Sequence, residues 1–179
     1  MRIRVAGITH ESLVDGPGLR TVIWGQGCPH GCPGCHNQHT QDPAGGDEVE
    51  IEEIFHQIDG SCLARGVTLS GGEPFLQPAA FARLAAYARG KGLDVWAYTG
   101  FTFERLLQLS GEEPAVIELL KNVDVLVDGP FVEAEKDLNL VFRGSRNQRI
   151  IDVPRSLDKK AVVVIPDMYF RTEKVVASF

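Results

Sequence analysis

The sequence lacks an apolar run of about 18 residues, the minimum for a transmembrane helix. Its first residues, MRIRVAGITHES, also lack the apolar core of a signal peptide. Basic residues are not in excess, because 18 Lys and Arg stand against 24 Asp and Glu for a formal net charge of −6. This balance argues against broad nucleic-acid binding. We therefore expect a cytoplasmic protein that binds no membrane and no nucleic acid.

Cysteine is scarce, with four among 179 residues. In a reducing compartment such thiols serve as ligands or catalysts more often than as disulfides. Internal repeats and low-complexity segments are also missing. The 44% of hydrophobic and 23% of charged residues are ordinary for a folded protein. At this length we expect one domain over residues 1–179.

Short apolar segments alternate with helical patterns along the chain. We expect strands at residues 3–8, 20–24, 67–69, 93–98, 123–127, 148–153 and 161–165. Helices are expected at residues 50–58, with Asp47 as a possible N-cap, and at 78–90, 103–109 and 115–120. The alternation predicts an α/β fold with a mostly parallel sheet. Its functional loops should follow the carboxyl ends of the strands, at residues 25–36, 70–74, 99–100 and 128–131.

Three cysteines, Cys28, Cys32 and Cys35, have the spacing C-x3-C-x2-C. The Pro and Gly residues between them disfavour a helix, so the loop can aim three sulfur atoms at one point, which implies a metal. A four-iron cluster normally takes four cysteines, so three would leave one iron open, as a catalytic metal requires. Cys62 stands apart, and we interpret it as a small hydrophobic core residue.

Other interpretations of the cysteine loop remain open. The loop could be buried without a metal, although packing does not require this spacing. A zinc site would need a fourth ligand. Four side chains could supply it: His30, His36, His39 and Cys62. Residues 32–36 also match the C-x-x-C-H pattern of haem attachment, but that pattern is usual in exported proteins and gives Cys28 no role.

The cysteine spacing and the downstream segment SGGEP at residues 70–74 together resemble the radical S-adenosylmethionine (SAM) superfamily. The segment VDGPGLR at residues 14–20 and CHN at 35–37 resemble its glycyl-radical activating enzymes. Three further segments resemble the activators of anaerobic ribonucleoside-triphosphate reductase: YTG at 98–100, VLVDGPF at 125–131 and FRGSRNQR at 142–149. The resemblance therefore extends from residue 14 to about residue 150.

The resemblance implies an incomplete (β/α) barrel of the radical SAM type with a mostly parallel sheet. It also implies a 4Fe-4S cluster held by Cys28, Cys32 and Cys35, and SAM, which chelates the open iron through its amino group and carboxylate. In the family an electron from the cluster cleaves SAM into methionine and a 5′-deoxyadenosyl radical. That radical takes a hydrogen atom from a backbone glycine of a partner enzyme.

Several residues would bind SAM by the same resemblance. Gly71, Gly72 and Glu73 would meet its methionine end, while Gly34 and His36, on either side of Cys35, would pack near the adenine. Asp128 would bind the amino-acid end or a cation.

Each polar candidate has an alternative role. Glu73 could be a carboxylate at a helix start before Pro74, His36 could face solvent, and Asp128 could form an Asx turn with Gly129.

The implied partners are the catalytic subunit of anaerobic ribonucleotide reductase and, as electron donor, reduced flavodoxin or ferredoxin. Residues 15–20 and 143–149 are candidate docking elements, although Arg143, Arg146 and Arg149 could equally form a solvated basic stretch. An activator of pyruvate formate-lyase is the alternative enzyme. Its characteristic acid and lysine are missing here from AYTG at 97–100 and DGP at 128–130. A zinc-stabilised binding module is the non-enzymatic alternative.

Overall fold

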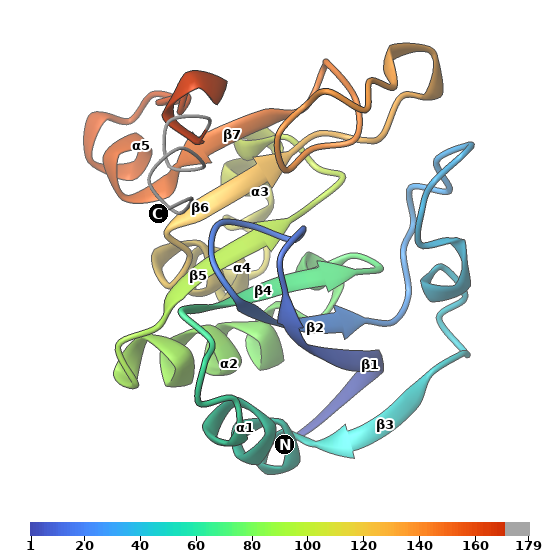
Figure 1. Cartoon of the computed structure of the whole chain (residues 1–179), viewed down its shortest axis with the longest axis vertical. Coiled ribbons are helices and arrows are strands. Elements are labelled where there is room, and N and C mark those ends of the chain that lie inside the picture. The colour runs from blue at the N-terminus through green and yellow to red at the C-terminus, as the bar shows by residue number, and fades with distance from the viewer. Residues whose placement is uncertain (171–179) are drawn as a thin grey trace, which may run out of the picture.

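A seven-stranded sheet organises residues 1–170, the part of the chain that the computed structural model describes. Its strands are β1 (Arg2–Ser12), β2 (Arg20–Gly25), β3 (Asp47–Glu50), β4 (Gly66–Gly71), β5 (Asp94–Tyr98), β6 (Val125–Asp128) and β7 (Arg149–Asp152). Figure 1 shows the sheet open, with β3 and β7 at opposite edges of the order β3-β1-β2-β4-β5-β6-β7. The four central strands, β2, β4, β5 and β6, are parallel, and the outer pairings are antiparallel. The expected α/β class is confirmed.

In this part of the chain five labelled helices lie between or after the strands, and residues 167–170 are also helical. The five are α1 (Ile51–Gly60), α2 (Pro78–Gly90), α3 (Phe103–Leu109), α4 (Pro114–Lys121) and α5 (Val153–Lys159). Short 3-10 turns occur at Gln38–Thr40, Pro74–Leu76 and Glu133–Glu135. The apolar sides of α1 to α4 share one hydrophobic cluster with the strands. None of the helices among residues 1–170 is long and apolar enough to cross a membrane.

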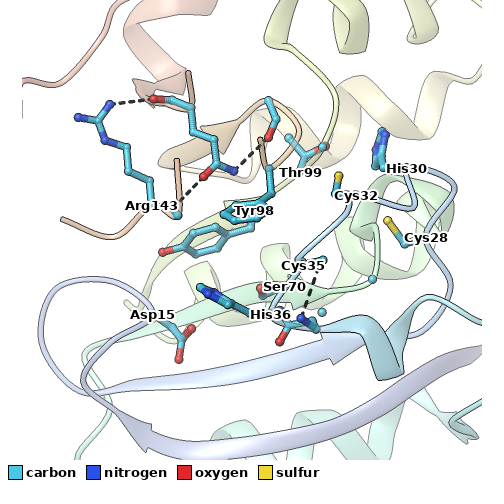
Figure 2. Close-up of a pocket in the computed structure, with 18 of the residues that line it drawn as sticks. Asp15, Cys28, His30, Cys32, Cys35, His36, Ser70, Tyr98, Thr99 and Arg143 are labelled. Carbon is cyan, nitrogen blue, oxygen red and sulfur yellow. Dashed lines mark hydrogen bonds between the residues drawn. The ribbon is translucent and has the colours of Figure 1, made fainter. Parts of the chain in front are cut away.

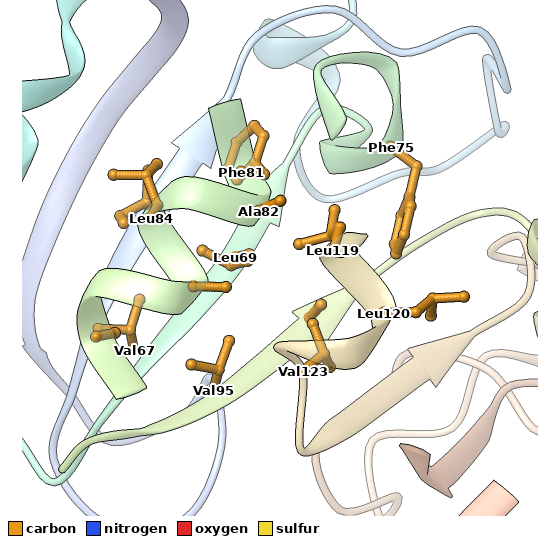
Figure 3. Packing of buried hydrophobic residues seen from close by; sticks show 14 of the residues in the cluster. Val67, Leu69, Phe75, Phe81, Ala82, Leu84, Val95, Leu119, Leu120 and Val123 are labelled. Atoms are coloured by element: carbon orange, nitrogen blue, oxygen red, sulfur yellow. The ribbon is translucent and has the colours of Figure 1, made fainter. Parts of the chain in front are cut away.

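The side-chain alternation of β4 and β5 gives the sheet two different faces. Val67, Leu69, Val95 and Ala97 are fully buried in the core beneath the helices, and Figure 3 shows several of these side chains facing those of α2 and α4. The residues between them are polar or aromatic and point to the opposite face: Thr68, Ser70, Trp96 and Tyr98. The polar and aromatic face is therefore the one that is free to carry a site.

Two details of the expected secondary structure are wrong. Residues 161–165 form no strand, because they make only an isolated bridge between Ile151 and Val164, and Pro166 has no N–H group to extend a ladder. Asp47 is not a helix cap, because its backbone pairs with Val5 at the start of β3. Glu50 occupies the N-cap of α1 instead, and its N–H donates to the Glu53 carboxylate at 3.3 Å.

Arg20 is a fully buried cation on the face of the sheet opposite α1 to α4. Its Nε donates to Thr68 Oγ1 at 2.7 Å, and its Nη2 lies 2.7 Å from the Asp94 carboxylate. The Thr68 hydroxyl in turn donates to the carbonyl of Asp15 at 2.7 Å. Gly16 leaves room for the guanidinium, since a Cβ there would lie 2.6 Å from the Arg20 side chain. Arg20 thus holds the loop at residues 13–19 over the sheet and is not exposed to a partner.

Shortening a buried side chain of α4 should lower the free energy of unfolding strongly, because α4 packs into the core beneath the helices. Leu119 is fully buried, so Leu119→Ala should lower the free energy of unfolding by about 3 kcal/mol, because it leaves a cavity. Leu107 on α3 is 38% exposed, and Leu107→Ala should change it by less than about 1 kcal/mol. Urea unfolding of the metal-free chain, followed by circular dichroism, measures both. Equal losses would contradict this assignment of the core.

Candidate metal and cofactor site

A cavity of about 400 Å³ opens at the carboxyl ends of the parallel strands, and the arrowheads of β2, β4, β5 and β6 point to this side of the sheet in Figure 1. All four expected loops contribute to its lining, including Cys28 after β2, Gly71 at the end of β4, Thr99 after β5 and Gly129 after β6. The predicted gathering of these loops is confirmed. A volume of roughly 300–1,000 Å³ is typical of small-molecule and cofactor sites.

The three closely spaced cysteines, Cys28, Cys32 and Cys35, all line this cavity and are half-buried. Figure 2 shows them on one loop that faces the cavity. The N–H of Cys35 donates to the carbonyl of Cys32 at 3.2 Å, and positive φ angles of 55° at Gly31 and 70° at Gly34 allow the loop to wrap. Within residues 1–170, no three His, Cys, Asp or Glu side chains converge closely enough to hold a metal ion. The loop therefore presents three thiols to one cavity without drawing them to a single point.

The donor chemistry of this loop fits an iron–sulfur cluster, because soft thiolates are the ligands that such clusters take. Burial raises the pKa of the Cys28 thiol, against the opposing effect of the backbone N–H of His30. A bound cation would reverse this preference, since ligand cysteines are deprotonated. Of the alternative zinc ligands, His30 and His36 line the cavity, whereas His39 and Cys62 do not.

Cys62 is exposed, so its interpretation as a core residue is wrong. It follows Ser61, the C-cap of α1, in a turn where its N–H donates to the carbonyl of Gly60 at 3.1 Å. A residue in such a turn projects beyond the helix and misses the core.

Gly71 and Gly72 bring the end of β4 against the cysteine loop. A Cβ on Gly71 would lie 2.6 Å from the carbonyl oxygen of Gly25, and one on Gly72 would lie 2.2 Å from that of Gly27. The N–H groups of Gly72 and Glu73 donate to these two carbonyls at 2.8 Å each. Both glycines line the cavity. Close backbone approach is therefore the reason that glycine occupies these two positions.

The Glu73 side chain is fully buried and is not among the residues that line the cavity. One carboxylate oxygen accepts from the N–H of Phe75 at 3.0 Å, as expected of a carboxylate at a helix start. The other accepts from the N–H of Gly100 at 2.8 Å and lies 3.0 Å from His30 Nε2. The Thr99 hydroxyl donates to the same carboxylate at 2.9 Å. The protein's own donors therefore occupy this carboxylate.

Gly34 and His36 flank the last cysteine in different ways. Gly34 does not line the cavity, and a Cβ there would lie 2.9 Å from the Glu133 side chain. His36 lines the cavity and is exposed, with its ring centroid 5.7 Å from that of Phe131. His36 and Phe131 therefore form an aromatic pair beside the cysteines.

Asp128 ends β6 and is 1% exposed. It accepts from the N–H of Phe103 at 2.8 Å and from Nε of Arg149 at 2.9 Å. Arg149 also pairs with Glu104 at 2.8 Å and lowers the pKa of that carboxyl to about 2. Asp128 does not line the cavity. Its carboxylate instead joins the end of β6 to the start of α3 and to β7.

The three arginines of residues 143–149 are all paired. Arg143 lies 2.6 Å from Asp167, and Arg146 lies 3.0 Å from Asp137, in addition to the Arg149 pairs. Arg146 has a side chain that is 70% exposed, whereas that of Arg143 is 17% exposed. This segment is therefore not a free basic stretch.

Asp15 and Arg143, expected only in docking elements, and Tyr98, to which no role was assigned, form one wall of the cavity. Figure 2 shows Tyr98, Arg143 and Asp15 across the cavity from the cysteine loop. The Tyr98 hydroxyl donates to the carbonyl of Phe142 at 3.0 Å, and burial raises the pKa of this phenol. The alternation of β5 places Tyr98 on the face opposite α1 to α4, and this alternation was the available signal. The contribution of residues 140–148 depends on a chain reversal that no local pattern marks.

Comparison with known proteins agrees with this geometry. A family model described as a 4Fe-4S single cluster domain matches residues 14–151, which include all three cysteines of the cavity. Curated proteins named anaerobic ribonucleoside-triphosphate reductase-activating protein are also similar. The one from Vibrio cholerae is 38% identical over 146 residues, covering 77% of this chain and 90% of its own.

The protein of the same name from Salmonella typhi is 37% identical over 145 residues, covering 76% of this chain and 90% of its own. This chain belongs to that family. A third relative, from Enterobacteria phage T4, is 36% identical over 148 residues, covering 77% of this chain and 86% of its own. The solved structure of QueE from Escherichia coli has a TM-score of 0.46 and 20% identity, over 57% of this chain and 54% of that one.

Because the Asp128 carboxylate is buried, we expect its ion pair with Arg149 to be needed for stability. Arg149→Met should lower the free energy of unfolding by about 3 kcal/mol, because it leaves a buried charge unpaired. Arg146→Met removes an exposed pair and should change it by less than about 0.5 kcal/mol. Chemical denaturation of the metal-free variants measures the difference. A loss in Arg149→Met no larger than in Arg146→Met would show that the pair is not required.

Proposed function

We propose that this protein is a radical SAM activating enzyme, which uses a 4Fe-4S cluster and SAM to generate a glycyl radical on anaerobic ribonucleoside-triphosphate reductase. The observation that carries the proposal is the meeting of three cysteines and the Gly71-Gly72 turn in one cavity. Membership of the family of reductase-activating proteins supports the choice of target. We take the open sheet to be part of an incomplete barrel, and residues 1–179 to be one domain, although residues 171–179 lie outside the described part.

Cys28, Cys32 and Cys35 would hold the cluster, which when bound supplies the electron that cleaves SAM. The backbone of Gly71 and Gly72 would approach the methionine end of SAM, because neither residue carries a Cβ to block it. His36, which faces the cavity beside Phe131, would meet the adenine. These residues bind and orient, and the chemistry is that of the cofactors.

Three further candidates, Glu73, Asp128 and Gly34, would act on SAM indirectly, because other residues of the protein already contact them. The Glu73 carboxylate accepts hydrogen bonds from the Thr99-Gly100 turn, and the Asp128 carboxylate pairs with Arg149. Gly34 allows close packing against Glu133. We therefore assign all three to positioning the loops that surround SAM, rather than to contacts with it.

The partner's glycine would enter where the cavity meets solvent. Val14 and Leu140 line the cavity from two different loops, and Val14 is 77% exposed. Tyr98, whose hydroxyl donates a hydrogen bond to the carbonyl of Phe142, lines the same cavity. The partners would be the catalytic subunit of the reductase and, as electron donor, reduced flavodoxin or ferredoxin, in the cytoplasm.

Anaerobic reconstitution tests the activity. With a strong reductant, the wild-type protein should convert SAM into methionine and 5′-deoxyadenosine, and electron paramagnetic resonance should show a glycyl doublet when the reductase is added. Cys28→Ser, Cys32→Ser and Cys35→Ser should each abolish SAM cleavage, because each removes a cluster ligand. Cys62→Ser is the matched control and should cleave SAM as the wild type does, since Cys62 is exposed and away from the cavity.

Each alternative gives a different result in the same experiment. A colourless protein with one bound zinc ion and no SAM cleavage would favour a zinc-stabilised binding module. SAM cleavage without a glycyl doublet on the reductase would point to another glycyl-radical enzyme, such as pyruvate formate-lyase.

A further inference from the structure

The Glu73 side chain is buried and does not line the cavity. Taking a carboxylate out of water is costly unless donors replace the water. Here the replacement donors come from three separate segments: the N–H of Phe75 on its own turn, Thr99 and Gly100 after β5, and His30 of the cysteine loop. Glu73 therefore joins three loops at one point.

His30 is the contact between this carboxylate and the cysteine loop. It lies between Cys28 and Cys32, and its Nε2 is 3.0 Å from Glu73 Oε2. A carboxylate that already accepts from Gly100 and Thr99 is an acceptor, so Nε2 is the atom that donates. The His30 side chain is 16% exposed, so water competes little for this bond.

The packing around His30 supports the same contact independently. Its ring meets that of Phe101 edge to face, with centroids 4.5 Å apart. A Cβ on Gly100 would lie 2.3 Å from Cδ2 of His30, so the ring fits against this turn because residue 100 is glycine. Figure 2 shows His30 next to Thr99 and beside Cys28 and Cys32.

We propose that Glu73 and His30 form a clamp that fixes the cysteine loop against the Thr99-Gly100 turn. In this clamp both are positioning residues, which set where the three thiols stand relative to the cofactor pocket. The clamp itself is a property of the metal-free chain, and its effect on SAM rests on the proposed function. Because one carboxylate binds both loops, a shift of the cysteine loop would be transmitted to the turn that lines the pocket.

Two substitutions at His30 separate the hydrogen bond from the ring. His30→Phe keeps a ring against Phe101 but has no donor for Glu73, whereas His30→Gln keeps an amide donor near the position of Nε2 and loses the ring. Amide hydrogen exchange of the metal-free chain measures loop opening. His30→Phe should speed exchange at the Cys35 amide about tenfold, the effect of one hydrogen bond to a charged group. His30→Gln should exchange as the wild type does.

Glu73→Gln gives a second, distinguishable pattern. In His30→Phe the Gly100 amide should stay protected, because Glu73 still accepts from it. In Glu73→Gln one of the two acceptor oxygens becomes an NH2 group, which cannot accept, so the donors of Phe75, Thr99, Gly100 and His30 can no longer all be satisfied and the amides of both Gly100 and Cys35 should exchange faster. His39→Phe is the matched control, since His39 is an exposed histidine of the same connection and lies outside the cavity. Exchange at Cys35 in His30→Phe equal to that in wild type would overturn the clamp.

The loaded protein provides a readout that a loss of general stability would not produce. The spectrum of the reduced cluster, recorded by electron paramagnetic resonance, should change on SAM addition in wild type and His30→Gln, and less in His30→Phe. An unchanged response in His30→Phe would contradict the effect on SAM. If the wild type itself takes up no cluster, the proposed function fails, while hydrogen exchange of the metal-free chain still decides the clamp.

Discussion

The cavity depends on one buried carboxylate. Glu73 follows the close-packed glycines of β4, and its oxygens can be satisfied only when the β5 turn and the cysteine loop are both in place. A buried charge without its donors is costly, so the three loops have one low-energy arrangement together rather than three independent ones. The spacing between the cysteines and the pocket for a cofactor follows from that arrangement.

Two kinds of contact, apolar packing and polar pairing, contribute differently to the stability of the fold and to the position of the loops. Beneath the helices, close-packed aliphatic side chains supply most of the stability. Polar contacts hold the loops: Arg20 does so for residues 13–19 on the opposite face, and Arg149 does so beside α3 at the end of β6. Contacts between apolar side chains have little dependence on direction, whereas a charged pair with several hydrogen bonds fixes the relative orientation of the two segments that it joins. In this protein such charged and hydrogen-bonded contacts hold the loops around the cavity.

Much of the architecture was predictable, because it follows from local periodicity. The helix Phe103–Leu109 and the central strands β4, β5 and β6 appear where apolar patterns place them. The expectations were wrong where contacts with distant segments of the chain decide the conformation of a residue. Residues 161–165 are apolar enough for a strand but meet β7 only at an isolated bridge, and Asp47 joins β3 because β1 lies beside it. Cys62 has the composition of a core residue, but the end of α1 directs it to solvent.

The sequence by itself determined the cysteine loop that we propose as the cluster site, because the spacing of Cys28, Cys32 and Cys35 is local and a chain of that length brings its own thiols to one side. It also determined the strand ends at which the loops gather, since parallel strands place them at one edge. Only the tertiary structure decided which polar residues face the cavity. Glu73 and Asp128 are buried by partners dozens of residues away, and Tyr98 bonds to the carbonyl of Phe142 across a chain reversal, with Arg143 in the same cavity wall. Such contacts depend on how distant segments pack, which no local pattern encodes.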